Sequence, residues 1–208
     1  MLDERLIDVA RAAKGFMPDD EGRALHDAAV EAARRAGGPF VEIGSYCGKS
    51  GVYLGAAARE ADTVLFTVDH HRGSEENQSG WEHHDRELVD PTTGRMDTLP
   101  HFRRTIEAAG LEDVVVAVVG SSVPVARAWA TPVGFLFIDG GHALDVAMAD
   151  YEHWSRWVKP GGTLAIHDVF ERESDGGQAP FEVWQRAVRD GFEPIGRTGS
   201  LRILRRTA

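Results

Sequence analysis

Apolar residues along this chain alternate between helical spacing and the short continuous runs of buried strands. Helical spacing predicts helices over residues 2–14 and 19–35, and the same pattern resumes after residue 97. The other helices expected from it cover residues 50–60, 98–109, 122–130, 143–158 and 180–190. The expected strands cover residues 39–44, 63–70, 113–119, 133–139, 162–168, 192–197 and 200–206. This alternation predicts an α/β fold with a doubly wound, mostly parallel sheet and helices on both faces, whose last strand is antiparallel.

Residues 71–97 interrupt the pattern, because they carry neither a helix nor a strand period and are rich in Gly, Ser, Glu, Asn, His and Pro. A loop of this length within a compact domain is usually a lid or a binding loop, or else disordered. We therefore expect the 208 residues to form a single domain, with N-terminal helices at 2–36 and a lid-like insertion at 71–97.

Composition narrows the class of protein. A hydrophobic fraction of 42% and a charged fraction of 27% are typical of a globular protein, and a net charge of −10 argues against a nucleic-acid partner. Cys47 is the only cysteine, which excludes a disulfide within the chain and fits a reducing compartment. The acidic start MLDERLIDVA lacks the features of a signal peptide, and no apolar run approaches the ~20 residues that span a bilayer. We expect a cytoplasmic protein with no membrane partner.

Two glycines, Gly44 and Gly48, bracket the turn between the strand at 39–44 and the helix at 50–60. Glycine allows the backbone to approach a ligand closely, and the helix N-terminus offers unpaired N–H groups. The G-x-x-x-G spacing differs from the G-x-G-x-x-G of dinucleotide-binding folds, which disfavours a nicotinamide cofactor. The alternative is a glycine turn that binds no ligand.

Acidic residues near the ends of two strands strengthen the interpretation as a ligand site. Glu42 suits a positively charged amino-acid group, and Asp69 is placed to accept hydrogen bonds from ribose hydroxyls. A ligand with a nucleoside at one end and an ammonium group at the other is S-adenosylmethionine (SAM). Ser121 and Ser122 follow the third strand, where they either reach the adenine or simply cap the next helix.

Asp139 and Asp168 end two strands that we expect to be neighbours. Two close carboxylates repel each other unless one is protonated or a cation lies between them, and such oxygen ligands suit Mg²⁺. The alternative is that each aspartate caps the segment that follows it. His142 comes three residues after Asp139, and a histidine, which ordinarily titrates near ~6.5, is a workable general base. Its alternative is a solvent-exposed histidine at a helix start.

The remaining histidines of the insertion match no structural zinc spacing. We expect them to line a polar substrate cleft together with other polar residues and a tryptophan, although a solvated loop is the alternative. The residues are His70, His71, His83, His84, Glu75, Glu76, Asn77, Gln78 and Trp81.

The stretch EIGSYCGKS, residues 42–50, resembles ELGAYCGYS of the catechol O-methyltransferase family, and a looser similarity extends over residues 39–170. The resemblance implies a Rossmann-like class I methyltransferase fold with a seven-stranded sheet. It implies SAM contacts at Glu42, Tyr46, Ser50 and Asp69, whereas Lys49 replaces an aromatic residue of the pattern. We expect Gly44, Gly48, Ser121, Ser122 and Asp139 to complete the SAM site. It also implies acidic metal ligands at Asp139 and Asp168, a general base at His142, and a role for His167 that either tunes the site or, as a ligand, favours Mn²⁺ over Mg²⁺.

Two further stretches, GFMPDDEG at 15–22 and HHRGSEENQ at 70–78, resemble an actinobacterial group of sugar O-methyltransferases. This group includes the sugar 1-O-methyltransferase of mycobacterial methylmannose polysaccharide biosynthesis and is related to macrolide-sugar enzymes. The resemblance implies a small sugar acceptor, the 1-OH of a short methylmannoside, and we expect a homodimer. The alternatives are a macrolide sugar or a catechol-like acceptor, a nicotinamide-dependent oxidoreductase, and a SAM-binding protein without catalysis.

Overall fold

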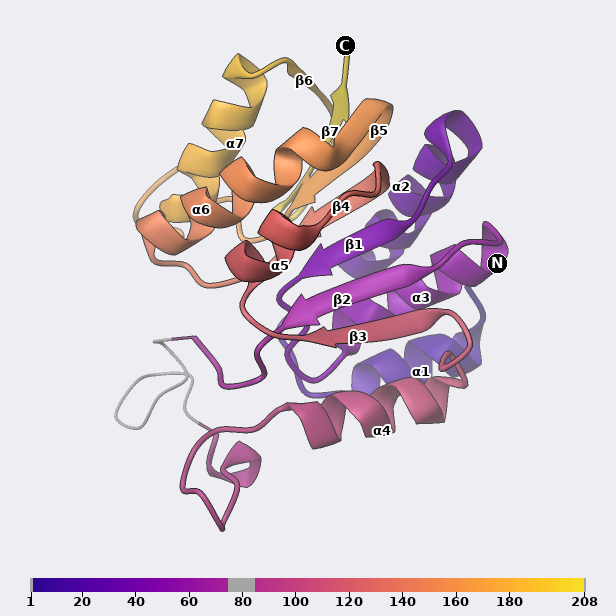
Figure 1. Ribbon diagram of the computed structural model, residues 1–208, viewed down its shortest axis with the longest axis vertical. Helices are drawn as coiled ribbons and strands as arrows, with labels where there is room; N and C mark the ends of the chain where they lie inside the picture. The colour runs from indigo at the N-terminus through magenta and orange to yellow at the C-terminus, as the bar shows by residue number, and fades with distance from the viewer. Residues whose placement is uncertain (1, 75–84, 208) are drawn as a thin grey trace.

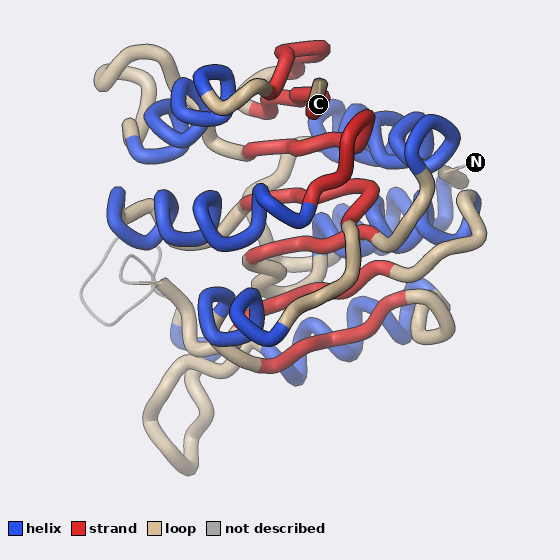
Figure 2. Tube along the Cα trace, turned by 45° about the horizontal axis from the view of Figure 1, so that its top comes forward, coloured by secondary structure: helices blue, strands red, loops and turns tan. Residues whose placement is uncertain are grey.

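The computed structural model of the protein describes residues 2–74 and 85–207. One seven-stranded sheet lies between two layers of helices (Figures 1 and 2). The strands are β1 (Phe40–Ile43), β2 (Leu65–Asp69), β3 (Val115–Val119), β4 (Val133–Ile138), β5 (Val158–Ile166), β6 (Phe192–Thr198) and β7 (Leu201–Arg206). Their order is β3-β2-β1-β4-β5-β7-β6, and β7 is antiparallel to both of its neighbours while the other pairs are parallel. The predicted fold class is confirmed.

The two helical layers follow from the alternation of apolar side chains along the strands. Phe40 and Phe135 face a cluster that contains residues of α1 to α4, whereas their chain neighbours Val41 and Leu136 face one that contains residues of α5 to α7. The helices are α1 (Glu4–Ala12), α2 (Asp19–Ala36), α3 (Lys49–Glu60), α4 (Leu99–Ala109), α5 (Ser122–Ala128), α6 (Leu144–Trp154) and α7 (Ala179–Arg189), with short 3₁₀ turns η2 (Arg86–Leu88) and η3 (Ser155–Trp157). Among the described residues, none of these helices has the length and apolarity needed to cross a membrane.

One element boundary differs clearly from the expectation. The helix predicted over 143–158 ends at Trp154, and β5 begins at Val158 rather than at residue 162. Lys159 precedes Pro160, and the proline ring disfavours helical backbone at the residue before it. Lys159 therefore favours the extended backbone of β5, and between α6 and β5 the chain passes through η3 (Ser155–Trp157).

The strand order reverses between β1 and β4, which lie side by side at the centre of the sheet. Open α/β folds bind ligands at such a switch point, beyond the carboxyl ends of the strands. The arrowheads of β1 to β4 in Figure 1 point to one side of the molecule. The fold places four predicted site residues along one rim, because each lies at or just beyond the carboxyl end of a strand. They are Glu42 of β1, Asp69 of β2, Asp139 after β4 and Asp168 after β5.

Candidate active site

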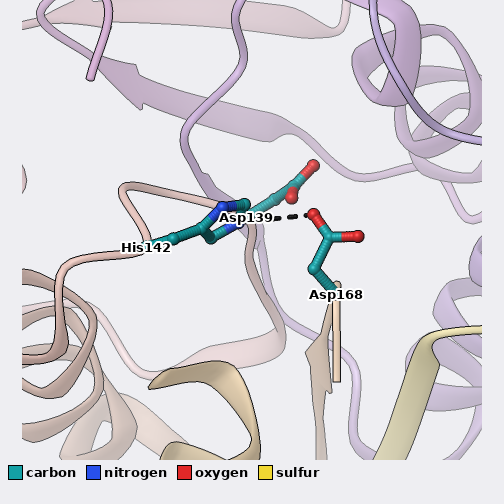
Figure 3. A group of neighbouring side chains, drawn as sticks. All are labelled: Asp139, His142 and Asp168. Atoms are coloured by element: carbon teal, nitrogen blue, oxygen red, sulfur yellow. Dashed lines mark ion pairs between the residues drawn. The ribbon is translucent and has the colours of Figure 1, made fainter. Parts of the chain in front are cut away.

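Asp139, His142 and Asp168 form a cluster at this rim (Figure 3). Each of them offers one ligand atom, and the three atoms lie within 4.8 Å of one another. Nε2 of His142 lies 3.3 Å from Oδ2 of Asp168, and each side chain is partly exposed. Two carboxylates with one imidazole are a donor set that suits Mg²⁺ or Mn²⁺. The structure thus brings the predicted base together with the two predicted acidic ligands.

The backbone of Asp168 is unusual, with a φ angle of 53° in the left-handed region. A residue with a side chain rarely adopts this conformation, and such strain concentrates at functional sites. Tyr46 and His71 follow β1 and β2 at the same rim and also adopt the left-handed region, with φ angles of 47° and 57°.

His167 lies beneath the cluster, with only 3% of its side chain exposed. Its Nδ1 is 3.1 Å from Oδ1 of Asp139 and 3.4 Å from Oδ2 of Asp168, and its Nε2 is 2.6 Å from Oε2 of Glu21. Burial lowers the pKa of His167, but these carboxylates outweigh burial and hold it far above its usual range. Both ring nitrogens of His167 thus face carboxylates. The expectation that His167 ligates a metal stays a prediction.

The charges around His167 do not cancel. Burial raises the pKa of Asp168, but hydrogen bonds from His142 and His167 outweigh it and leave that pKa well below its usual range. The pKa of Glu21 is likewise lowered, because contacts with His167 and Ser200 outweigh burial. The carboxyl groups of Asp139, Asp168 and Glu21 all face the single imidazole of His167, so acidic groups outnumber the basic one. The residues thus fit a divalent cation in charge as well as in donor type.

Glu21 is a site residue that the sequence analysis missed. It lies in the first turn of α2, is 4% exposed, and accepts a hydrogen bond from the Ser200 backbone N–H at 2.6 Å. A signal was present, because Glu21 shares the buried face of α2 with Leu25 and Ala29 at a spacing of four residues. A carboxylate on the apolar stripe of a helix indicates a buried partner.

The glycine turn is required mainly by contacts within the protein. Gly44 and Gly48 have φ angles of 82° and 88°. A Cβ atom on Gly44 would lie 2.2 Å from the carbonyl oxygen of Asp139, so a side chain there would separate the loops after β1 and β4. The absence of a side chain on Gly44 therefore lets its backbone approach the backbone of Asp139. The predicted close approach of the glycine turn to a ligand stays a prediction.

Glu42 and Ser50 form a buried pair behind this turn. Ser50 Oγ donates to Glu42 Oε1 at 2.5 Å, whereas the buried Oε2 has no hydrogen-bond partner among the described residues. Burial raises the pKa of Glu42 to about 8, so the side chain is mostly neutral at pH 7. A cation bound nearby would favour its ionised form. The predicted contact of Glu42 with an ammonium group stays a prediction.

Hydrogen bonds to Asp69 link the glycine turn to the loop after β2. Its Oδ2 accepts backbone hydrogen bonds from Ser45 and Tyr46, both at 2.9 Å, and its Oδ1 accepts one from His71 at 2.7 Å. The Ser45 hydroxyl also donates to Oδ2, at 3.4 Å. The predicted ribose contact of Asp69 stays a prediction.

An open cleft of about 430 Å³ lies beside the ends of β2 and β3. Its lining consists of His70, Arg72, Gly73, Arg95, Met96 and Ser121. Of the two predicted serines only Ser121 lines this cleft, because Ser122 donates its hydroxyl hydrogen bond to the buried Asp150.

His71 does not line the cleft either, although it belongs to the predicted polar lining. It is 2% exposed, contacts Thr98 Oγ1 at 2.8 Å and packs against Phe102. The other predicted cleft residues lie outside the described residues: Glu75, Glu76, Asn77, Gln78, Trp81, His83 and His84.

Residues 41–169 match the sequence profile of a family described as a methyltransferase domain. This segment is more than half of the chain and contains the cluster, the glycine turn and the cleft, but neither Glu21 nor Ser200.

Several solved structures share the fold. The O-methyltransferase TomG from Streptomyces achromogenes, involved in tomaymycin synthesis and solved with SAM, has a TM-score of 0.66 at 17% identity, covering 100% of this chain and 92% of its own. An O-methyltransferase from Bacillus cereus, solved with SAH, has a TM-score of 0.63 at 17% identity, with 99% and 92% covered. A Corynebacterium glutamicum protein has a TM-score of 0.69 at 14% identity, with 100% and 91% covered. At identities of 14–17%, these matches show a shared fold and nothing further.

Proposed function

The chain belongs to the methyltransferase-domain family whose profile spans residues 41–169, and on this premise we propose that it transfers a methyl group from SAM to a hydroxyl oxygen with the help of a divalent metal. The observation that carries the proposal is the cluster of Asp139, His142 and Asp168 at the switch-point rim of a methyltransferase domain. Two carboxylates and a histidine at that place are what activation of an acceptor hydroxyl requires.

The residues that would hold SAM lie between the ends of β1 and β3. Glu42, with its unpartnered buried oxygen, would face the ammonium end, and Asp69 and Ser121 would serve the nucleoside end beside the cleft. The turn from Gly44 to Gly48, with Tyr46 and Ser50, would enclose the middle of the molecule. When bound, SAM supplies an electrophilic methyl group on a sulfonium centre.

Asp139 and Asp168 would hold Mg²⁺ or Mn²⁺, since their carboxylates offer oxygen atoms of the kind these ions prefer. When bound, the metal polarises an acceptor hydroxyl and so lowers its pKa. The protein itself orients the acceptor toward the methyl group, and such positioning contributes ~7–11 kcal/mol to lowering the barrier.

His142 acts as the general base in this proposal. Its Nε2 faces Asp168 at 3.3 Å, so that carboxylate orients the imidazole and stabilises its protonated form after it has taken the hydroxyl proton. Asp168 would then have two roles, because it would hold the metal and also orient the base.

We propose a small sugar as the acceptor, with the 1-OH of a short methylmannoside as the first choice. Support comes from the sequence resemblance at residues 15–22 and 70–78 and from the polar side chains of His70 and Arg72 in the cleft lining. An anomeric hydroxyl is more acidic than an ordinary alcohol, so it suits a site with a metal and a histidine base. A macrolide sugar or a catechol is the second candidate, because the glycine turn resembles that of the catechol enzymes.

The test is a SAM consumption assay over methylated mannosides, macrolide sugars and catechols, with Mg²⁺, with Mn²⁺ and with excess EDTA. We expect turnover with a mannoside, its loss in EDTA and its return when metal is restored. Full turnover in EDTA would contradict the proposed metal requirement, and turnover with catechols alone would contradict the proposed sugar acceptor.

A further inference from the structure

Glu21 joins three distant parts of the chain beneath the metal cluster. It lies in the first turn of α2, His167 follows β5, and Ser200 lies in the turn between β6 and β7. Oε1 of Glu21 accepts from Ser200 N at 2.6 Å, and Oε2 contacts Ser200 Oγ at 3.2 Å and His167 Nε2 at 2.6 Å. All three residues are at most 9% exposed. Three hydrogen bonds from two distant residues, His167 and Ser200, therefore converge on this one carboxylate.

The turn before Ser200 is shaped around this carboxylate. Gly199 has a φ angle of 51°, and a Cβ atom on it would lie 2.0 Å from Glu21 Oε1. Only glycine permits this approach. With Nε2 of His167 directed at Glu21, its Nδ1 is directed at the other side, 3.1 Å from Asp139 and 3.4 Å from Asp168.

We propose that Glu21 is a positioning residue of the metal site, which acts by holding His167 in the orientation that keeps Asp139 and Asp168 together. This inference rests on the proposed metal-assisted function and extends it to residues outside the 41–169 segment of the family match. The metal ligands are then supported by α2 from one end of the chain and by the β6–β7 turn from the other. Outer partners of metal ligands typically change metal affinity ~10–100-fold when they are mutated.

A purely structural role, in which Glu21 only fastens α2 to the β6–β7 turn, makes a different prediction. Glu21→Gln keeps the size of the side chain and retains an oxygen that can accept from Ser200 N. It replaces Oε2, the oxygen that faces His167, with an NH₂ group. Asp19→Asn is the matched control, because Asp19 lies in the same turn of α2 and holds Arg11 at 2.6 Å without contacting His167.

The experiment measures the dissociation constant of Mn²⁺ alone by electron paramagnetic resonance, and that of SAM by calorimetry, for the wild type and both variants. Glu21→Gln should weaken Mn²⁺ binding ~10–100-fold and leave SAM binding within about twofold, whereas Asp19→Asn should change neither. Equal Mn²⁺ affinity in Glu21→Gln and wild type would overturn the inference and leave the proposed function standing. Absence of Mn²⁺ binding to the wild type would overturn both.

Discussion

Two carboxylates of the site differ in protonation: Glu42 is fully buried, whereas Asp168 is partly exposed. Burial raises the pKa of Glu42 to about 8, and the hydrogen bond from Ser50 does not offset this effect. Asp168 is held ionised, since the hydrogen bonds from His142 and His167 outweigh burial and lower its pKa. The difference comes from the donors each residue meets, and pairs of groups with divergent pKa values are typical of catalytic sites.

Glu42→Gln should stabilise the ligand-free protein at high pH. Because the pKa of Glu42 is about 8 in the folded protein and 4.5 as the unperturbed value, the folded state holds a proton between these pH values that the unfolded chain has released. The free energy of unfolding of the wild type therefore falls as pH rises through this range, by at most ~5 kcal/mol. In Glu42→Gln this contribution is absent, because the amide does not titrate. Urea unfolding should give variant and wild type similar stabilities near pH 4.5 and favour the variant at pH 8.

The exposed substitution Glu107→Gln serves as the control for this comparison and should not change the pH dependence. If Glu42→Gln followed the wild-type curve at every pH, Glu42 would be ionised in the folded protein.

His142→Ala should lower kcat by ~10²–10⁴-fold while leaving the dissociation constants of SAM and Mn²⁺ nearly unchanged, because its proposed role is that of a base. Histidine ordinarily titrates near neutral pH, so the wild-type kcat/KM should rise through that range and the variant should lack the rise. His153→Ala, in α6, is the control. A large loss of Mn²⁺ affinity in His142→Ala would identify His142 as a third metal ligand instead.

Among the elements, the described part of the insertion is tied to the body of the protein. Lys14 Nζ contacts Asp85 Oδ2 at 2.5 Å and Glu87 Oε2 at 2.6 Å. Leu88 and Met96 are buried against Cys47, next to the glycine turn. Residues 85–97 are thus linked to the loop after α1 and to the predicted SAM site, which is where a lid needs its base. The lid itself stays a prediction.

Lys14→Gln should loosen this attachment. Lys14 makes two ion pairs of ~0.2–1 kcal/mol each, so the amides of Asp90 and Asp97, which donate to Arg95 and Leu88, should exchange with deuterium about two- to thirtyfold faster. Arg59→Gln breaks an exposed pair with Asp113 elsewhere and should leave these amides unchanged. Equal exchange in all three proteins would mean that apolar packing alone holds the segment.

In the whole molecule, a segment near the start of the chain and one near its end meet beneath the rim that carries the cluster. The segment matched by the family profile contains the metal and SAM candidates, but the buried partners of His167 come from α2 and from the β6–β7 turn. Binding of a ligand at the rim should therefore stabilise the protein as one unit rather than a part of it.

SAM should raise the melting temperature of the protein, and NADH should not. At a SAM concentration 100 times its dissociation constant, the stabilisation is ~2.7 kcal/mol, which for a domain of this size corresponds to about 5–10 °C. Differential scanning fluorimetry with each cofactor measures the shift. A shift with NADH and none with SAM would favour the nicotinamide alternative over a methyltransferase.

The order of elements and the rim that carries the chemistry follow from the sequence alone. Helix and strand periods depend on neighbouring residues, so α3, β4 and α7 begin and end within a residue or so of their predicted bounds. Because parallel strands end on one side, the acidic residues at the ends of β1, β2, β4 and β5 had to share a rim. The grouping of Asp139, His142 and Asp168 was predictable in the same way.

The tertiary structure decided what each of these side chains does. Glu21 and His167 are 146 positions apart, and no local pattern indicates that they meet or that both nitrogens of His167 face carboxylates. The burial of Glu42, and the contact of Gly44 with the carbonyl oxygen of Asp139, likewise depend on packing between distant segments. Charge state is set by partners and by burial, which only the folded chain brings together.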